Sequence, residues 1–163
     1  MPESENRKSE NRTVPAPVPE VEPRHGIDPR GPRFGAIVSA VLLATTVVVG
    51  PGPVGTGLLA LAAGLFLVGT ARGAQGSVQG WAFRRWVRPR LSAPLSLEDP
   101  APPRFAQGVG LVVTTAGLAV GLVTPVGITV AAGIALVAAF LNAAFGFCLG
   151  CEMYLLLRRL RRA

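Results

Sequence analysis

The stretch VGITVAAGIALVAAFLNAAFGFCLGCEMYLLL, residues 126–157, runs for 32 residues without a Lys, Arg or Asp. Its one acidic residue is Glu152, and the only two cysteines of the chain, Cys148 and Cys151, lie next to it. About 20 consecutive apolar residues are enough to span a bilayer. The stretch therefore predicts a membrane-inserted helix, and its polar end is the place where we expect any chemistry.

Three further apolar blocks, residues 34–49, 54–71 and 105–123, also lack Lys, Arg and Asp. A backbone inside lipid must satisfy its own hydrogen bonds, so each block predicts a helix. As one helix, residues 126–157 would be about 48 Å long, which exceeds a hydrocarbon core of about 30 Å. The sequence predicts an all-α integral membrane protein with four transmembrane helices, arranged as two tandem helix hairpins. A soluble helical core is the competing interpretation, but it would leave almost no polar face for water.

The basic residues are segregated along the chain. All 16 Lys and Arg lie in residues 7–33, 72–104 and 158–162, and the turns at residues 50–53 and 124–125 carry none. Because positively charged loops stay in the cytoplasm, both termini are predicted to be cytoplasmic, in a multi-pass protein of the bacterial inner membrane. The net charge of +7 is then a signal of topology rather than of nucleic-acid binding.

The two ends of the chain differ from its apolar blocks. Residues 1–26 are rich in Pro, Glu and Ser and predict a disordered cytoplasmic tail. No signal peptide is expected, since the first apolar block starts only at Phe34. Residues 27–158 form the predicted four-helix membrane domain, and residues 159–163 form a basic tail.

A short motif occurs twice, as DPRGPRF at residues 28–34 and as DPAPPRF at residues 99–105. Each copy stands directly before an apolar block, so it predicts a collar that starts a helix with proline and anchors an arginine at the membrane surface. We therefore expect duplicated hairpins of the same orientation. The first hairpin has no cysteine in the matching residues 73–80. The repeated collar positions are Asp28, Pro29, Pro32 and Arg33 in the first copy and Asp99, Pro100, Pro103 and Arg104 in the second.

The central loop predicts an interfacial helix at residues 81–88, ended by Pro89 and lying in the lipid headgroup layer. On a regular helix one arc would carry Phe83, Trp86, Val87 and Leu91, and the opposite arc Arg84, Arg85 and Arg88. Elsewhere, glycines four residues apart, such as Gly117 and Gly121, predict close helix packing. Membrane lipid is one predicted partner, and whether the protein forms a homo-oligomer stays an open question.

Cys148 and Cys151 are three residues apart, which puts them on one face of a straight helix. Glu152 falls beside them, whereas Asn142 falls on a different stripe together with Gly146 and Gly150. Counted from the start of the apolar stretch, the cysteines lie about 33 Å along the helix, at or near the cytoplasmic surface. Asn142 is therefore predicted to be a structural polar residue that does not touch the thiols, unless the two glycines kink the helix.

Three interpretations of the cysteine pair stay open. The first is a dithiol for thiol redox or sulfur relay, since the Cys-x-x-Cys spacing supports thiol exchange. Against it, the pair lies late in the predicted helix, and the charge of Glu152 would raise the pKa of a neighbouring thiol. The second is a packing role for two small polarizable residues. The third is a metal site, but two thiolates alone suit only Cu(I) or a site shared in a dimer, and the single histidine, His25, lies in the tail. A structural disulfide is not expected in the reducing cytoplasm.

The chain resembles a known family at three places. These are the collar IDPRGPRF at residues 27–34, the loop at residues 88–107 and the end pattern N-A-x-x-G-x-C-x-G-C-x-x-Y at residues 142–154. Together they resemble the bacterial domain-of-unknown-function 4395 family, over residues 27–158. The resemblance implies a small integral membrane protein whose partners are soluble thioredoxin-like or rhodanese-type sulfurtransferase proteins. It also implies a structural motif around the cysteines, formed by Asn142, Gly146, Gly150 and Tyr154.

Three functions follow as hypotheses. In the first, Cys148 and Cys151 are exchanging or persulfidated thiols that face the cytoplasm, and Glu152 is their proton acceptor. In the second, the protein is a non-catalytic membrane anchor that recruits a soluble partner through the basic central loop and residues 158–162. The third, transport of a small solute, is weaker, because apart from Glu152 and Asn142 the helices are expected to lack polar groups that line a path. No cofactor, resident metal or nucleic acid is expected, and whether the protein is an enzyme stays open.

Overall fold

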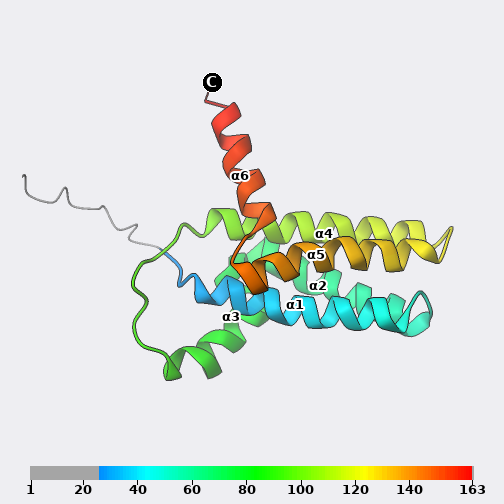
Figure 1. Cartoon of the computed structure of the whole chain (residues 1–163), viewed down its shortest axis with the longest axis horizontal. Helices are drawn as coiled ribbons and strands as arrows, with labels where there is room; N and C mark the ends of the chain where they lie inside the picture. The colour runs from blue at the N-terminus through cyan, green and yellow to red at the C-terminus, as the bar shows by residue number, and fades with distance from the viewer. Residues whose placement is uncertain (1–25, 163) are drawn as a thin grey trace, which may run out of the picture.

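Four long helices dominate the structure, a computed structural model that describes residues 26–162 (Figure 1). They are α1 (Arg30–Val49), α2 (Pro53–Gly76), α4 (Ala101–Gly121) and α5 (Val126–Phe145). Each is long and apolar enough to cross a membrane, and 20 residues of helix measure about 30 Å. The predicted all-α fold with four spans is confirmed. The predicted disorder of the N-terminal tail, and His25 with it, falls on residues outside the described part of the chain.

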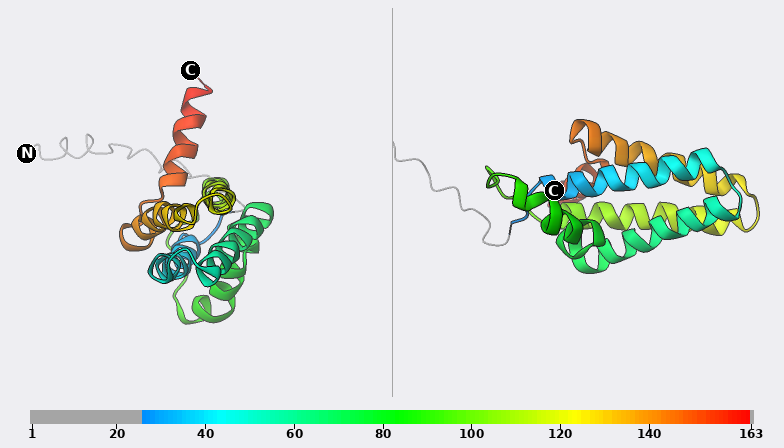
Figure 2. Two further views of the ribbon diagram at one scale, coloured as in Figure 1. Left: turned by 90° about the vertical axis from the view of Figure 1, so that its right-hand side faces the viewer. Right: turned by 90° about the horizontal axis from the view of Figure 1, so that it is seen from below.

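The four spans form two hairpins that pack into one bundle. Short turns join α1 to α2 and α4 to α5, and both turns lie at the same end of the bundle (Figure 1). Helix α1 packs on α2 and α5, and α4 packs on the same two helices. Viewed along the bundle, the order around the ring is therefore α1, α2, α4, α5 (Figure 2). The other end of the bundle holds the arginines of residues 30–104 and 158–162, and we call it the basic end.

Small side chains let these helices approach closely. The core is built from Leu43, Leu59, Phe66 and Ile128, surrounded by buried alanines of α2 and α5. A side chain on Gly117 would overlap Ala131 of α5, which fits the packing expected from the glycine spacing. Valines on the outer faces of all four spans remain exposed. Such a continuous apolar surface suits a bilayer and not water.

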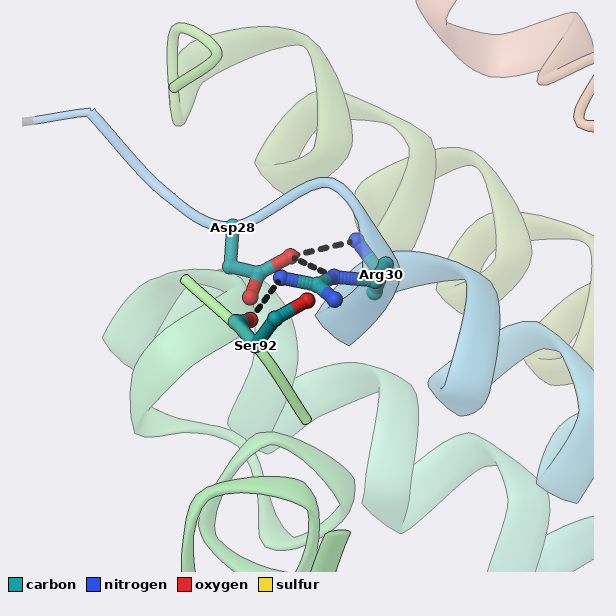
Figure 3. Close-up of polar contacts among 3 residues, drawn as sticks. All are labelled: Asp28, Arg30 and Ser92. Carbon is teal, nitrogen blue, oxygen red and sulfur yellow. Dashed lines mark hydrogen bonds and ion pairs between the residues drawn. The ribbon is translucent and has the colours of Figure 1, made fainter. Parts of the chain in front are cut away.

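The two collars start their helices in the same way. The backbone N–H of Arg30 donates to Asp28 Oδ1 at 3.0 Å, and that of Ala101 donates to Asp99 Oδ1 at 2.9 Å. Both aspartates thereby satisfy an N–H that the first helical turn leaves free. Asp28 also forms an ion pair with the Arg30 guanidinium, which donates to the Ser92 carbonyl at 2.9 Å (Figure 3). The central loop is thus held against the start of α1.

The collars also contact each other. Ile27 and Glu98, the residues directly before the two aspartates, exchange two backbone hydrogen bonds of 2.8 and 2.9 Å as an isolated antiparallel bridge. Ile27 is only 2% exposed. The bridge joins the starts of α1 and α4 at the basic end.

Each collar arginine caps the second helix of the other hairpin. Arg33 donates from its guanidinium to the carbonyls of Ala143 and Ala144 at the end of α5, both at 3.0 Å. Arg104 donates to the carbonyls of Thr70 and Ala71 in α2, at 2.7 and 3.1 Å. The last carbonyls of a helix lack partners within the helix, and the fork of a guanidinium suits two adjacent acceptors. The arginines therefore cross-link the two hairpins, a role beyond surface anchoring.

The central loop begins with an irregular helical segment rather than one regular helix at residues 81–88. It consists of α3 (Val78–Ala82), a π-helical turn η1 (Phe83–Val87) and a 3-10 turn η2 (Arg88–Arg90). Because the period changes in the π turn, Phe83 and Trp86 do not share one exposed arc. Phe83 is 3% exposed and packs on Phe34, whereas Trp86 is exposed. Pro89 lies inside the last turn, which ends at Arg90.

The predicted single helix at residues 126–157 is wrong. The structure has two helices there, α5 and α6 (Leu149–Leu160), with a break at residues 146–148. Helix α6 runs away from the bundle, across its long axis (Figures 1 and 2). The excess length of the apolar stretch is therefore absorbed by a change of direction, and α5 alone has the length of a span.

Candidate functional site

Gly146 ends α5 and sets the direction of the chain that follows. Its φ of 69° and ψ of 11° lie in the left-handed region, which glycine adopts without the steric penalty of a Cβ atom. Its N–H donates to the Asn142 carbonyl at 3.0 Å, and the N–H of Phe147 donates to the Leu141 carbonyl at 3.3 Å. This pattern is a common helix C-terminus with glycine in the left-handed position. Gly146 is therefore a helix terminator and not part of a packing stripe.

Cys148 begins the new helix. It is the N-cap residue of α6, with an extended backbone, and its sulfur accepts the backbone N–H of Cys151 at 3.3 Å. N-cap side chains commonly accept this bond, from the third residue of the helix. The expectation that the cysteines lie late in a helix is thus wrong, because the break places them at a helix start. The free N–H groups there favour negative charge.

The two cysteines are joined in a disulfide, with Cα atoms 5.2 Å apart. That separation lies within the usual range for disulfides. The sequence did not lead us to expect a structural disulfide. In the chain-entropy account a disulfide stabilises the folded state more when it closes a longer loop. With two residues between the cysteines, this bond restricts the unfolded chain little, so holding the fold together is a minor role for it.

Helix α6 is fixed to α4 near its start. Gly150 lies so close to Ala106 that a side chain on the glycine would overlap it. One turn later the rings of Tyr154 and Phe105 pack at a centroid distance of 5.7 Å. Arg158 and Asp99 approach to 4.0 Å, with both side chains about half exposed, so this ion pair contributes little. The apolar contacts set the position of the cysteines relative to the bundle.

The cysteines lie at the mouth of a large groove of about 870 Å³. Its walls come from α1, α4 and α5, with Phe66 of α2 and the start of α6 completing the lining. It reaches from the basic end to Val113, about 18 Å along α4. Most of the lining is apolar, and the polar side chains are concentrated toward the cysteines. Small-molecule sites of proteins typically have this size and this mixture of surfaces.

Most of the predicted site residues meet in this groove. They are Pro29, Pro32, Arg33, Pro103, Asn142, Gly146, Cys148, Gly150, Cys151 and Glu152. Asn142 was expected to point elsewhere on a straight helix, but the break after α5 brings it to the same groove as the thiols. Five do not line the groove: Asp28, Asp99 and Pro100 stand at the helix starts, Arg104 bonds carbonyls of α2, and Tyr154 packs on Phe105.

Sequence reasoning missed four polar groove residues: Arg30 and Glu98 at the basic end, and Gln107 and Ser39 within the spans. Ser39 is 6% exposed on α1, and Gln107 projects from α4 against Gly69 of α2. The buried Oε1 atom of Gln107 has no hydrogen-bond partner within the described residues. The expectation that only Glu152 and Asn142 supply polar groups in the spans is therefore wrong. An amide inside an otherwise apolar block was the available signal.

Within residues 26–162, no three His, Cys, Asp or Glu side chains cluster closely enough to hold a metal ion. The fold and the groove define a multi-pass helical membrane protein with a Cys-x-x-Cys pair at the opening of an apolar groove. The family model of a domain of unknown function, DUF4395, matches residues 27–159, so the chain belongs to this family. The family resemblance noted in the sequence is thereby confirmed. No curated protein and no solved structure gives a significant match to the chain.

Proposed function

We propose that the protein is a membrane-bound dithiol that exchanges electrons with a soluble thioredoxin-like protein through Cys148 and Cys151. The observation that carries this proposal is the placement of both sulfurs in bonding contact, half buried at the start of α6 and at the groove mouth. A pair used only for packing would be expected in a closed interface. Here the same pair is reachable from outside the bundle.

The position of Cys148 suits a nucleophilic thiol. In the reduced protein its sulfur stays at the N-terminus of α6, where the N–H of Cys151 points toward it. Helix N-termini stabilise thiolates, and the thiolate is the reactive form. Glu152 follows directly and lines the same groove, so it is the carboxylate that exchanges protons with the thiols. Its repulsive effect on a thiolate is opposed by the backbone N–H groups of the helix start.

The exchange balances as an ordinary thiol–disulfide reaction. A partner thiolate attacks the sulfur of Cys148, a bond forms between them, and the bond to Cys151 breaks. The Cys151 thiolate takes up one proton. The second partner thiolate then attacks the partner's own sulfur in the mixed disulfide and releases Cys148, which takes up the second proton. The partner leaves as a disulfide, and this protein becomes a dithiol.

Sulfur relay uses the same residue. The Cys148 thiolate attacks the outer sulfur of a persulfide on a rhodanese-like partner, and the partner leaves as a thiolate. Cys148 then carries the persulfide, with no change in the number of electrons shared by the two proteins. The helix start supports this step equally, but the step needs no second cysteine. The presence of Cys151 in bonding contact favours redox exchange.

The proposed location places the dithiol at the cytoplasmic face of the inner membrane. All arginines of the described residues lie at the basic end of the bundle, which the distribution of positive charge assigns to the cytoplasm. Helix α6 supports a position at the membrane surface. Its apolar arc is opposed by arginines, which suits a helix lying in the headgroup layer. This arc consists of Leu149, Met153, Leu156, Leu157 and Leu160.

A second candidate is a non-catalytic anchor that recruits a soluble protein through its basic surface. The exposed arginines of η1, η2 and α6 favour this reading, since they cover the same end of the bundle. Anchoring needs neither cysteine. A cysteine substitution therefore distinguishes the two functions: it abolishes thiol exchange in the first and leaves binding of the soluble partner unchanged in the second.

Trapping of the mixed disulfide tests the proposal. The purified full chain, in detergent and in its oxidised form, is mixed with a thioredoxin whose second active-site cysteine is replaced by serine. We expect a covalent complex with wild type and with Cys151→Ser whose Cys148 has first been converted to a mixed disulfide with thionitrobenzoate, which is the leaving thiolate. Much less complex is expected with Cys148→Ser whose Cys151 has been converted in the same way. Equal trapping by both single variants would assign no special role to the start of α6. Absence of any complex, with normal non-covalent binding, would favour the anchor.

A further inference from the structure

We propose that the groove binds a membrane quinone and that the Cys148–Cys151 dithiol reduces it to a quinol. This inference rests on the dithiol function proposed above and names its second substrate. The protein would then pass two electrons from a soluble dithiol to a carrier dissolved in the bilayer.

The groove has walls that suit a lipid-soluble ligand. Its deep part lies between α1, α4 and α5, among apolar residues such as Val109, Val113 and Ile134. It extends about 18 Å along spans that face lipid on their outer sides. A polar ligand would lose hydration there without compensation. The volume of about 870 Å³ lies in the range that holds one small organic molecule.

The groove also has polar groups where a ring with carbonyl oxygens needs them. Gln107 lines the groove; its Oε1 atom is covered by Gly69 of α2, whereas its Nε2–H group, which is not among the buried atoms, can donate to a ligand oxygen. Ser39 contributes a hydroxyl from the facing helix α1. A ligand with carbonyl oxygens accepts the N–H of Gln107 and so gains a directed hydrogen bond inside an otherwise apolar groove. A bare acyl chain would leave the amide unsatisfied.

The thiols at the mouth specify a redox-active ligand. A dithiol gives up two electrons and two protons when it closes to a disulfide, and a quinone accepts the same number of each. Arg33, at the mouth, holds the carbonyls of Ala143 and Ala144 and so keeps the start of α6 at this opening. The ligand ring and the sulfur of Cys148 are thereby brought to one place.

The reaction balances in two steps. The Cys148 thiolate adds to a carbon of the quinone ring, a carbon–sulfur bond forms, and an electron pair moves to a ring oxygen. The Cys151 thiolate then attacks the sulfur of Cys148, the disulfide forms, and the carbon–sulfur bond breaks with its electron pair going to the ring. The two protons lost by the thiols end on the two oxygens of the quinol, and Glu152 is placed to pass them.

The experiment measures quinone reduction by the pre-reduced full chain, in detergent and without oxygen, with decylubiquinone as the probe. Loss of quinone absorbance and formation of the disulfide are followed together. Three variants are compared with wild type. Ala138→Phe fills the groove, Gln107→Leu removes its amide, and Ala116→Phe places the same ring on the exposed outer face of α4 as a control.

We expect wild type and Ala116→Phe to reduce the quinone at the same rate. Ala138→Phe should lower that rate by about 10²-fold, as expected when a reactant is displaced from its position, and Gln107→Leu should raise the quinone concentration for half-maximal rate. Equal rates in wild type and Ala138→Phe would overturn the groove as the site. Absence of reduction in wild type, while exchange with thioredoxin proceeds, would overturn the quinone and leave the dithiol function standing. Failure of both reactions would remove both proposals.

Discussion

Near its end α2 bends at Gly73, and Ser77 then caps the start of α3; after α5 the chain turns at Gly146, and Cys148 caps the start of α6. Both glycines have positive φ values, 76° and 69°. Ser77 accepts the N–H of Gly80 at 2.9 Å, just as Cys148 accepts the N–H of Cys151 at 3.3 Å. The two turns thus use the same cap at the same spacing, with oxygen in one and sulfur in the other.

The surroundings of the two turns differ more than their backbones. Ser77 is 3% exposed, and a side chain at Gly80 would collide with the Ala74 carbonyl. The first turn is therefore closed and has no room for a second thiol. The cysteines are half buried at the mouth of a groove. The comparison teaches that the cap geometry serves folding in both turns, whereas access to the groove separates a chemical site from a structural one.

The tandem repeat stays a prediction from the sequence, and three parallels between the two halves support it. The supports are the repeated collar motif, the crossed arginine contacts and the matching aromatic pairs Phe34–Phe83 and Phe105–Tyr154. Phe105 lies 71 residues after Phe34, and Tyr154 lies 71 residues after Phe83. Duplicated halves of membrane proteins often meet at a functional site, and the groove lies between α1 and α4, the first helices of the two hairpins.

The largest effect, on the rate of thioredoxin exchange, is expected when the thiol is removed from the second turn and introduced into the first. Cys148→Ser should keep α6 capped, since serine is a good N-cap residue, and should lower thioredoxin exchange by several orders of magnitude. In a chain without Cys148 and Cys151, Ser77→Cys should not restore exchange, because the site is buried. Mass-tagged maleimide labelling and trapping measure both. Efficient labelling of Ser77→Cys before unfolding would contradict the closed first turn.

The next effect concerns the two glycines. Gly73, with ψ of 170°, lies in a region used almost only by glycine, so Gly73→Ala should cost about 1–3 kcal/mol. Gly146 is in the ordinary left-handed region, so Gly146→Ala should cost about 1–2 kcal/mol. Asparagine tolerates that region, and Gly146→Asn should be milder than Gly146→Ala. Thermal unfolding in detergent gives the order, and the reverse ranking of the two alanine variants would show that the turns are not built as described.

A smaller effect is expected from the crossed arginines. Arg33→Lys and Arg104→Lys each replace a fork by a single ammonium group, which cannot bond two carbonyls in the same way. Each should lower the free energy of unfolding by about 1 kcal/mol, below the roughly 1.5–3 kcal/mol of hydrogen bonds to charged groups because both arginines are exposed. Only Arg33→Lys should also lower the rate of thiol exchange. Arg33 holds the end of α5, and this end leads directly into the segment that carries the cysteines. Equal exchange rates in the two variants would leave Arg33 with a structural role alone.

The smallest effect is expected from removing the caps. Ser77→Ala should cost about 1 kcal/mol, as is usual for a lost N-cap. The second comparison is between Cys148→Ala and Cys148→Ser, because both lack the disulfide. The alanine variant should have a free energy of unfolding lower by a similar amount. Cys148→Ser itself should be at least as stable as the reduced wild type, because oxygen accepts hydrogen bonds better than sulfur. Chemical unfolding in mild detergent measures the three differences, and a Cys148→Ser variant less stable than Cys148→Ala would argue against the cap.

Several features followed from local sequence. The first three spans agree with their predicted blocks within about five residues, whereas the fourth ends at Phe145 instead of residue 157. Helices α1 and α4 start earlier than their apolar blocks, at Arg30 and Ala101, because proline and the collar aspartates support the first turn. The cysteine pair was recognised as the candidate site. The polar groove residues Gln107 and Ser39 were not recognised, because nothing in a single helix shows which of its faces meets a cavity.

The sequence by itself determined the membrane class, the number of spans and the segregation of charge, and it singled out the cysteine pair as the candidate site. Hydropathy and charge act locally, so runs of about 20 apolar residues between arginines are readable without a structure. Only the tertiary structure decided that the chain breaks at Gly146, which turns late helix residues into a helix start. That break needs partners for the carbonyls at the end of α5, and Arg33 supplies them from 110 residues away. Contacts at such a distance depend on how the two hairpins pack, and the same packing leaves the groove open beside the thiols.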